Sequence, residues 1–444
     1  MKRQLSSFQI IIGGFMLVIL AGSVLLMLPF ATQDGRGASF LEALFTATSA
    51  TCVTGLVVQD TATYWSMFGQ CVILLLIQIG GMGVVTMVVM MSLIAGRRIG
   101  LKQRSIMQEA IAAPNLGGIV KLTGFIIKTT LAIEGMGALL LFPVFYKEFG
   151  FWRGLWFSVF HAISAFCNAG FDLMGEGAKY SSLTGYADDL VVNLVIMSLI
   201  VIGGIGFLTW EDVKNKGIHM KQYRMQSKVI LMVTAILIVI PFLFFYVLEL
   251  SGPHWQELSE GEKILAALFQ TITPRTAGFN TIDLTQMSEA GQTLTMLLML
   301  TGGAPGSTAG GMKVTTFTVL VLTMLAVFRR DEDANCFGRR IPEDTIRFAA
   351  TILLMYFLLF MTGGMVISVC EDLPMLTCLF ETASAIGTVG LTLGITPGLG
   401  AASRCVLIVL MFFGRVGCLT LVFAASSGTK INMAKLPKEK ITVG

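Results

Sequence analysis

The sequence predicts an all-α polytopic membrane protein in which a unit of two spans and an intervening re-entrant loop occurs four times. Hydrophobic residues make up 55% of the 444 positions and charged residues only 13%, about half the charged share of a soluble domain. Long charge-free stretches alternate with short basic segments, and one short motif recurs four times. This composition excludes a soluble enzyme, a disordered chain and a coiled coil, and it leaves room for roughly eight to twelve spans.

Eight stretches are long and apolar enough to cross about 30 Å of hydrocarbon as helices. Six of them contain no charged residue, one contains Lys128 and Glu134, and one contains Arg415. In chain order, the predicted spans are residues 4–33, 61–96, 122–146, 190–210, 229–248, 290–312, 348–370 and 405–429. The first span follows Lys2 and Arg3 as in a signal peptide, but its apolar run exceeds the roughly 7–15 residues of such a segment. We therefore expect it to be retained.

Four shorter apolar pieces lie between these spans, near residues 41–58, 154–173, 264–281 and 378–393. They are too short, or too interrupted by Gly, Pro, Ser and Thr, to span alone, so we predict that they enter the membrane and return to the same side. A loop at membrane depth must be sheltered by protein or line a water-filled cavity. Four such loops around one pseudo-fourfold axis satisfy both conditions.

The four loops share a sequence pattern. Each opens with Phe, continues with small and hydroxyl-bearing residues, and ends in Gly followed by a large apolar residue. The segments read Phe45-TATSATCVT-Gly55-Leu56, Phe160-HAISAFCNA-Gly170-Phe171, Phe269-QTITPRTA-Gly278-Phe279 and Phe380-ETASAIGTV-Gly390-Leu391. Because the motif recurs about every 110 residues, we predict four parallel structural repeats. Their predicted bounds are 1–96, 97–213, 214–330 and 331–444, the last including a C-terminal tail.

The distribution of basic residues predicts the orientation of the chain in the cell membrane. Most of the 31 Lys and Arg residues lie near the N-terminus, in residues 97–121, 214–228 and 329–347, or in the C-terminal tail. The excess of positive charge predicts that these segments, and therefore both termini, are cytoplasmic. All four re-entrant loops then enter from the outside.

Spans that flank re-entrant loops around one axis are typical of a cation pore. The first half of each loop can form a short pore helix, whose C-terminal dipole end favours a cation. In the extended second half, backbone carbonyls can replace the hydration shell of the ion. Glycine tolerates the backbone conformations that turn its carbonyl inward. The predicted filter residues are Thr54, Gly55, Ala169, Gly170, Ala277, Gly278, Val389 and Gly390.

A gate is predicted below this filter. The third repeat contains Thr301-GGAPGSTAGG-Met312 inside an otherwise apolar run, and helix is least favoured in such a Gly- and Pro-rich segment. We therefore predict an irregular loop between two helical pieces, over about residues 301–313. Arg415 lies at the same expected depth and should face the pore, because an arginine that faces lipid is costly. The predicted gate residues are Gly302, Gly303, Pro305, Gly306, Ser307, Thr308, Gly310, Gly311, Lys313 and Arg415. An arginine that only locks two repeats together is the alternative interpretation.

Other polar residues at membrane depth have weaker assignments. Glu134 is either functional or paired with a neighbouring repeat, whereas Lys128 can reach the headgroup region. Arg275, close to Gly278, should point away from a cation pore and tether its loop. Asp172 either adds negative charge to the outer vestibule or is a solvated loop acid.

The position after each loop Phe differs between the four repeats, so this ring of residues predicts packing or hydrogen bonding rather than a common ion ligand. The four residues are Thr46, His161, Gln270 and Glu381. The eight cysteines show no CxxC spacing and the three histidines are far apart, which argues against a metal or redox site. A net charge of only +4 makes nucleic acid an unexpected partner.

Taken together, the four loops, their glycines and the broken third inner span resemble the superfamily of K⁺ transporters that includes the Trk, Ktr and plant HKT proteins. The TPRTAGF segment at Thr273–Phe279 is most similar to the Ktr-type membrane subunit. The resemblance implies that K⁺ is the substrate and binds at the backbone carbonyls of Gly55, Gly170, Gly278 and Gly390. Some relatives carry Ser in the first loop and favour Na⁺, so Gly55 implies a preference for K⁺.

The same resemblance implies partners. It implies a homodimer with one pore per protomer, and a cytoplasmic RCK-type ring that binds an ATP- or ADP-type nucleotide. No segment here resembles that ring, so we expect the regulator to be a separate chain and this chain to carry no cofactor. Na⁺ is an expected modulator of transport.

Three other functions stay open at this point. The main alternative is a secondary cation transporter with alternating access, either a Na⁺-coupled or Na⁺-permeable member of the same superfamily or a H⁺-coupled transporter. Alternating-access folds often use inverted repeats, whereas these repeats are parallel. A membrane enzyme is disfavoured because no nucleophile, base or metal set is clustered in the sequence. The sequence alone does not exclude a partner that hydrolyses ATP.

Overall fold

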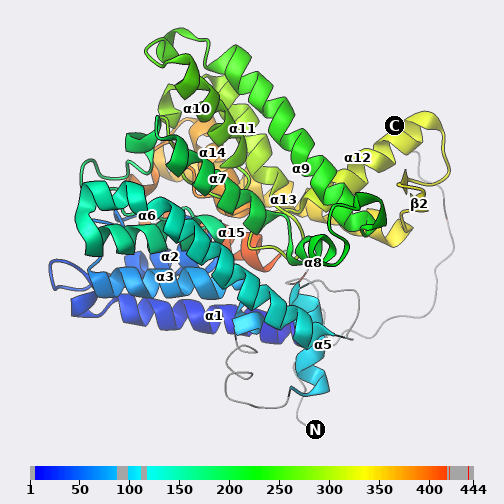
Figure 1. Cartoon of the computed structure of the whole chain (residues 1–444), viewed down its shortest axis with the longest axis horizontal. Helices are drawn as coiled ribbons and strands as arrows, with labels where there is room; N and C mark the ends of the chain where they lie inside the picture. Colours follow the sequence, from blue (N-terminus) through cyan, green and yellow to red (C-terminus); the bar gives the residue numbers. More distant parts are fainter. Residues whose placement is uncertain (1–5, 88–98, 112–117, 418–419, 421–438, 440–444) are drawn as a thin grey trace.

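The computed structural model describes residues 6–87, 99–111, 118–417, 420 and 439, and helices dominate it (Figure 1). The helices are α1 (Ser7–Leu26), α2 (Phe40–Thr51), α3 (Met67–Met82), α5 (Leu101–Ile111), α6 (Ile119–Phe166), α7 (Leu190–Gly204), α8 (Phe207–Lys216), α9 (Met225–Phe244), α10 (Glu260–Ile272), α11 (Glu289–Thr301), α12 (Val314–Arg329), α13 (Glu343–Glu371), α14 (Met375–Gly387) and α15 (Ala401–Val416). A small hairpin pairs β1 (Asn335–Cys336) with β2 (Arg339–Arg340) in antiparallel fashion. Short 3₁₀ turns lie at Pro29–Ala31, Thr184–Tyr186, Met220–Gln222, Pro253–Trp255, Leu284–Gln286 and Thr396–Gly398, and the π-helical turn Phe245–Glu249 extends α9.

The first span of each repeat is a long apolar helix. Within the described residues, α1, α6, α9 with its π-helical extension, and α13 are each long and apolar enough to cross a membrane. The long α6 range is interrupted at Gly150, whose φ of 74° and ψ of −176° are not helical. The part before Gly150 is therefore a span, and the part after it is a separate helix that returns toward the centre of the molecule.

Each re-entrant loop begins with the pore helix that the sequence predicts. These helices are α2, the part of α6 after Gly150, α10 and α14. Ser39 begins α2 and Ser259 begins α10, in each case with a Glu three residues later that completes a capping box. The capping box satisfies amide groups that the first helical turn cannot, so each of these helices starts at a defined residue.

The second span of each repeat is shorter than the sequence predicts, and the prediction of one continuous span over residues 190–210 was wrong. Helices α7 and α8 meet at an angle of 95°, because Gly206 between them has a φ of 90°. Helix α3 likewise ends before Gly83 and α15 before Gly417, both with positive φ. The remaining parts of the predicted spans, residues 88–96 and nearly all of 418–429, lie outside the described residues.

The third repeat breaks where its composition predicts. Helix α11 ends at Thr301, residues 302–313 are irregular, and α12 starts at Val314. The exact residue limits of the four repeats stay a prediction, because the linker residues 88–98 are not described.

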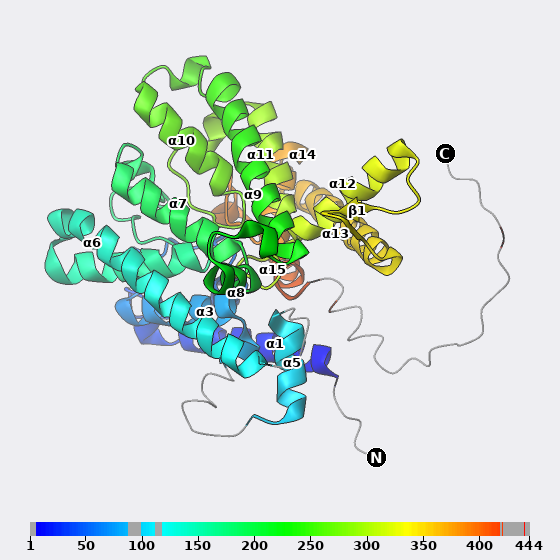
Figure 2. The same ribbon diagram turned by 45° about the vertical axis from the view of Figure 1, so that its right-hand side comes forward.

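The four repeats close around a common centre. The second span of each repeat packs against the pore helix of the next one, as α3 does on α6, α7 on α10 and α11 on α14, and α15 packs on α2 to complete the circle. The arrangement of the helices can be followed in two views (Figures 1 and 2), and α15 contacts α2 although the two lie far apart in the chain. The Phe that opens each of the four loop motifs lies in the core. All four of these side chains are completely buried: Phe45, Phe160, Phe269 and Phe380.

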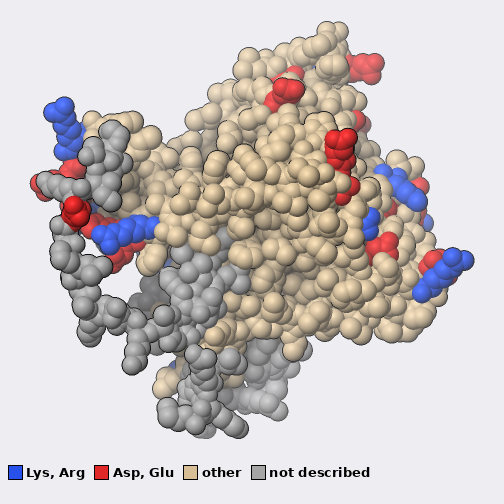
Figure 3. Space-filling model, turned by 180° about the vertical axis from the view of Figure 1, so that it is seen from behind, with Lys and Arg blue, Asp and Glu red and all other residues tan. Residues whose placement is uncertain are grey.

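The outer surface is apolar, as a lipid-facing surface must be. Large hydrophobic side chains on the long helices are widely exposed, among them Leu17, Leu139, Ile240 and Val369. Viewed from behind, the molecule shows a broad area without charge, and the Lys, Arg, Asp and Glu side chains gather toward its margins (Figure 3). Apolar patches of this extent are not tolerated on soluble monomers, and they fit the hydrocarbon core of a bilayer.

Candidate ion pore

Four glycines form a closed ring at the centre of the molecule. A Cβ atom added to Gly55 would meet the backbone at Ala169 and Gly170, and one added to Gly170 would meet the backbone at Ala277 and Gly278. The series continues from Gly278 to Val389 and Gly390, and returns from Gly390 to Thr54 and Gly55. The eight residues that the sequence predicts for the filter therefore come together, and only backbone fits between neighbouring loops.

The backbone of each loop follows the same unusual path. All four glycines have positive φ, at 91°, 69°, 85° and 100° in chain order. The residue two positions earlier also has positive φ in every loop, although none of the four is glycine: Val53, Asn168, Thr276 and Thr388. Such conformations cost energy outside glycine and persist only where the surroundings impose them. Their fourfold repetition indicates that the loops are held in one shape.

A hydroxyl group four residues after each loop Phe holds this shape. The Gly55 amide donates to the Ser49 hydroxyl at 3.1 Å, and the Gly390 amide donates to the Ser384 hydroxyl at 3.0 Å. In the other two loops the hydroxyl donates instead, from Ser164 to the Phe171 carbonyl and from Thr273 to the Phe279 carbonyl. Sequence reasoning missed these residues, although the aligned motif contains a Ser or Thr at this position in all four copies.

Two of the residues that follow the loop Phe act as hydrogen-bond acceptors behind the ring. His161 Nε2 accepts from the Leu173 amide at 3.3 Å, and Nδ1 lies 2.8 Å from the Phe157 carbonyl. Glu381 accepts from the Leu393 amide at 3.2 Å, from the Thr396 hydroxyl at 2.7 Å and from the Thr392 hydroxyl. The hydrogen bonding that the sequence predicts for this position is therefore confirmed in the second and fourth loops.

In the first and third loops, the matching side chains have no such hydrogen bonds within the described part of the chain. The side-chain polar atoms of Thr46 and Gln270 are buried and have no hydrogen-bond partner among the described residues. Since the loops follow one another around the ring, the second and fourth face each other across it. The backbone path is therefore the same in all four loops, whereas hydrogen bonds from the residue after the loop Phe support only two opposite loops.

The irregular segment of the third repeat lies directly beneath the ring. The Thr308 hydroxyl donates to the carbonyl of Phe166, the last residue of a pore helix, at 3.0 Å. A Cβ at Gly310 would overlap the side chain of Thr388, so the segment passes against the base of the fourth loop. Its backbone also bonds to the second span of the second repeat, where the Ala304 amide donates to the Gly204 carbonyl at 2.9 Å. We call residues 302–313 the intramembrane loop.

Arg415 connects this loop to the first repeat. Its guanidinium donates to the carbonyl oxygens of Thr308, Gly80 and Gly81. In addition, the Gly311 amide donates to the Gly414 carbonyl at 3.1 Å. The intramembrane loop and Arg415 therefore contact all four repeats just below the ring, as expected from their matching depths in the sequence.

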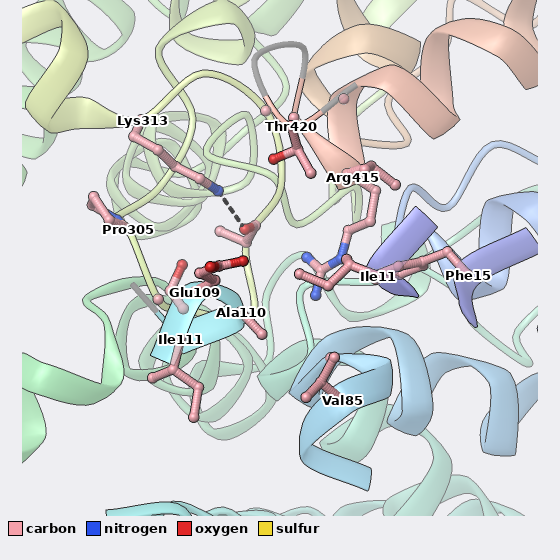
Figure 4. Close-up of a pocket in the computed structure, with 18 of the residues that line it drawn as sticks. Ile11, Phe15, Val85, Glu109, Ala110, Ile111, Pro305, Lys313, Arg415 and Thr420 are labelled. Atoms are coloured by element: carbon pink, nitrogen blue, oxygen red, sulfur yellow. Dashed lines mark hydrogen bonds between the residues drawn. The ribbon is translucent and has the colours of Figure 1, made fainter. Parts of the chain in front are cut away.

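A cavity of about 340 Å³ opens on the side of the intramembrane loop that faces away from the ring. Lys313 and Arg415 both reach into it from different elements (Figure 4). Lys313 Nζ turns back onto the loop and donates to the carbonyls of Ala309 and Gly310 at 2.8 and 3.0 Å. The end of α5 closes the cavity opposite them, where a Cβ at Gly306 would meet the Ile111 carbonyl oxygen. Two basic side chains, Lys313 and Arg415, therefore line this cavity.

The glycine clusters of the second spans have a specific packing role. A Cβ at Gly80, Gly203 or Gly414 would overlap the carbonyl oxygen of Thr51, Phe166 or Ile386, respectively. Each of these carbonyls lies at or next to the end of a pore helix. The clusters therefore let the pore-helix ends approach the second spans, which side chains would prevent.

The structure also shows the surroundings of three other polar residues that the sequence analysis discussed, Arg275, Glu134 and Asp172. Arg275 points away from the ring and donates to the Thr234 hydroxyl of α9 at 3.2 Å, so it tethers its loop as predicted. Glu134 pairs with a neighbouring repeat, since Gln78 of α3 donates to both carboxylate oxygens at 3.1 Å. Asp172 is partly exposed and accepts from the Met174 amide. Within the described residues, no group of three His, Cys, Asp or Glu could hold a metal ion.

Comparison with known proteins agrees with this architecture. Residues 3–432 match the family model TrkH, described as cation transport protein. The chain is 41% identical to the potassium/sodium uptake protein NtpJ of Enterococcus hirae, over all of this chain and 98% of that protein. It is also 41% identical to the Ktr system potassium uptake protein B of Bacillus subtilis, over 98% of this chain and 96% of that protein.

A solved structure shares the fold. The potassium transporter TrkH from Vibrio parahaemolyticus superposes with a TM-score of 0.76 at 21% identity, over 95% of this chain and 85% of that one. The match of a family model over nearly the whole sequence, the two full-length relatives and the four span–pore loop–span repeats lead to one conclusion. The chain is a membrane protein of the TrkH cation transport family, not an enzyme.

Proposed function

We propose that this chain is the K⁺-translocating membrane subunit of a potassium uptake system, and that K⁺ crosses it through the ring of four glycines. The observation that carries the proposal is the closed contact of Gly55, Gly170, Gly278 and Gly390 around one axis. Both full-length relatives named above have potassium uptake in their names, which supports K⁺ as the substrate.

The chemistry of the ring suits a monovalent cation. Only backbone groups fit between the loops, so the available ligands are carbonyl oxygens, which replace the water around K⁺. The four pore helices end within a few residues of the ring, and their C-terminal dipole ends favour positive charge there. The hydroxyl anchors and the carboxylate of Glu381 fix the loops without adding a charged side chain to the ring itself.

Below the ring, the intramembrane loop and Arg415 act as a gate in this proposal. The loop occupies the ion path, and the positive charges of Arg415 and Lys313 oppose the passage of K⁺. Arg415 ties the loop to α3, because it donates to the Thr308 carbonyl of the loop and to the Gly80 and Gly81 carbonyls of α3. Release of these hydrogen bonds would free the loop to move aside. A gate of this type has two discrete states that an external partner can bias.

The partner in this proposal is a separate cytoplasmic nucleotide-binding subunit, and the channel chain works as a homodimer with one pore in each protomer. The name of the Bacillus relative refers to a Ktr system, which supports a multicomponent assembly. The basic segments at 97–121, 214–228 and 329–347 support a cytoplasmic location for that side of the molecule and for both termini in the plasma membrane. Na⁺ is a modulator of transport in this view.

A Na⁺-permeable or Na⁺-coupled transporter is the second candidate, and the potassium/sodium uptake protein of Enterococcus hirae favours it. Ion flux into vesicles that contain the purified chain distinguishes the two, with K⁺, Rb⁺, Na⁺ and Li⁺ measured side by side. A K⁺ pore gives K⁺ and Rb⁺ flux well above Na⁺ and Li⁺ flux, without ATP hydrolysis and without obligatory counter-transport of another ion. Comparable Na⁺ flux, or K⁺ flux only in the presence of Na⁺ or ATP, would overturn the proposal.

A further inference from the structure

A basic groove lies on the outer face of α6, far from the ring of glycines. It has a volume of about 550 Å³ and is lined by residues of α6 and by Lys214 of α8. The two helices pass close to each other in both ribbon views (Figures 1 and 2). Gly124 leaves the floor of the groove open, since a Cβ there would meet nothing within 4 Å.

Three ammonium groups converge on this groove. Lys121 and Lys128 share one face of α6 with Phe125, because positions i, i+4 and i+7 of a helix lie on the same side. Lys214 reaches this face from α8, and its Nζ lies 4.3 Å from the centre of the Phe125 ring. The groove therefore combines three positive charges with an aromatic surface.

Nothing among the described residues neutralises these charges. The carboxylates of α8 are already engaged, because Glu211 pairs with Arg224 and Asp212 pairs with Lys216 and Arg224. In the described ranges, no ion pair involves Lys121, Lys128 or Lys214, and all three are exposed. A ligand of this groove must therefore be an anion.

The position of the groove along α6 indicates that the anion belongs to the membrane. Lys128 and Lys147 bracket a stretch whose only charged residue, Glu134, is buried. Nineteen residues of helix span about 28 Å, close to the roughly 30 Å of a hydrocarbon core. Lys128 therefore lies at the depth of the lipid phosphates, and Lys121 lies about 10 Å farther out.

Beyond Lys128 the same face of α6 becomes apolar. Ala132, Met136 and Leu140 continue the stripe toward the middle of the membrane, and all three are exposed. An acyl chain can pack along this stripe while its headgroup remains among the lysines. A free phosphate or nucleotide would use the charges but not the stripe.

We propose that this groove is a binding site for an anionic phospholipid of the phosphatidylglycerol class, whose phosphate lies between Lys121, Lys128 and Lys214 and whose acyl chain packs along Ala132 and Met136. Basic pockets at the membrane boundary recognise anionic headgroups in this way. The site is independent of the ion path, and it requires only that the chain lie in a bilayer.

The test is lipid retention by the purified full-length chain, measured by native mass spectrometry during titration with phosphatidylglycerol or with phosphatidylcholine of identical acyl chains. Wild type should retain phosphatidylglycerol in preference to phosphatidylcholine. Each of Lys121→Gln, Lys128→Gln and Lys214→Gln should weaken phosphatidylglycerol binding about fivefold. Lys221→Gln is the matched control, since Lys221 is exposed beyond α8 but does not line the groove, and it should bind as wild type does.

Two further variants separate the headgroup from the acyl chain. Lys128→Arg keeps the charge and should retain the lipid, whereas Ala132→Trp keeps all three lysines, fills the stripe and should lose it. Equal retention of both lipids by wild type, or unchanged phosphatidylglycerol binding in the combined triple lysine variant, would overturn the proposal. Inorganic phosphate that displaces the lipid from wild type at equal concentration would also overturn it, because the groove would then be an anion site without lipid specificity.

Discussion

The guanidinium of Arg415 lies 3.0 Å from the carbonyl oxygen of Gly81, so that α15 in the last repeat is hydrogen-bonded to the end of α3 in the first. The same guanidinium donates to Thr308 in the third repeat. One side chain thus closes the circle of repeats and holds the intramembrane loop at the same time. The gating interpretation and the purely structural interpretation of Arg415 differ in what its removal does to ion flux.

Replacement of Arg415 by Ala should raise K⁺ flux and reduce its dependence on the regulatory subunit. The variant removes a positive charge from the proposed ion path, together with the hydrogen bonds to Thr308 of the loop and to Gly80 and Gly81 of α3. Each of these bonds is worth about 1.5–3 kcal/mol because the donor is charged. We expect an increase of about tenfold or more in vesicle flux. Arg404→Ala is the matched control, because Arg404 lies on the same helix and bonds to Pro397 outside the gate. Unchanged or lower flux in a normally inserted Arg415→Ala protein would make the arginine structural.

Deletion within Gly306–Gly311 should also raise K⁺ flux, because the shortened intramembrane loop no longer reaches beneath the ring. The double change, deletion plus Arg415→Ala, provides the sharper measurement. If both act through one gate, their effects are not additive, and the double variant conducts no more than the faster single variant. If the increase in K⁺ flux of the double variant equals the product of the two single increases, the loop and Arg415 are two independent barriers.

Gly278→Ser should lower K⁺ uptake at least tenfold, or raise the K⁺ concentration needed for half-maximal uptake by that factor. Gly278 has a φ of 85°, and a Cβ there would overlap the Val389 carbonyl oxygen, so the side chain strains the backbone and distorts the ring. Gly261→Ser is the control, since Gly261 lies in the first turn of α10 with open space around it. A well-expressed Gly278→Ser protein with wild-type K⁺ affinity would remove this glycine from the filter.

Glu381→Met should reduce the preference for K⁺ over Na⁺ by several-fold without abolishing transport. It removes the carboxylate that accepts from the Leu393 amide and from the hydroxyls of Thr392 and Thr396. A hydrogen bond to a charged group contributes about 1.5–3 kcal/mol. The loop behind Gly390 then loses its support. Gln270→Met is the comparison variant, because Gln270 occupies the matching position and its side chain has no hydrogen-bond partner in the part of the chain that the structure describes. Equal changes of selectivity in the two variants would contradict a supporting role for Glu381.

Neutralisation of Arg339 and Arg340 should weaken co-purification of the regulatory subunit several-fold. Both residues are exposed on β2, in the hairpin that follows α12. Arg340 already pairs with Asp333 at 3.1 Å, so Arg339→Ala should account for more of the loss. Lys179→Ala is the control, because Lys179 is an exposed basic residue between α6 and α7, outside the three basic linkers. If binding persists after the basic residues of all three linkers are replaced, these charges serve only to orient the chain.

Much of the fold could be predicted from the sequence because its signals are local. Apolar runs mark the spans, and the aligned loop motif places the buried Phe45 and the ring residue Gly55 without any knowledge of tertiary contacts. The break at Gly206 was missed, because Gly-Gly-Ile-Gly also fits close packing inside a continuous membrane helix and contains no proline. The break after Thr301 was predicted correctly, because a segment with Pro305 and five glycines does not fit a continuous membrane helix.

The candidate site was harder to predict where it depends on contacts between repeats. The depth of Arg415 follows from the repeat spacing, but its acceptors at Gly80 and Gly81 lie more than 300 residues away and follow only from the closed circle. Likewise, the positive φ values at Val53 and Thr388 are imposed by tertiary packing, since these residue types disfavour that conformation. The hydroxyl anchors Ser49 and Ser384 were visible in the aligned motif, but their role requires the path of the loop.

The most direct test of the central claim is the position of a bound ion in the purified protein. Rb⁺ substitutes for K⁺ and can be located by its anomalous scattering in crystals grown with Rb⁺ in place of K⁺. The glycine-ring mechanism predicts Rb⁺ density on the axis of the ring, at similar distances from the carbonyl oxygens of Gly55, Gly170, Gly278 and Gly390. A fully occupied Rb⁺ site elsewhere in the membrane region, with no density in the ring, would contradict it.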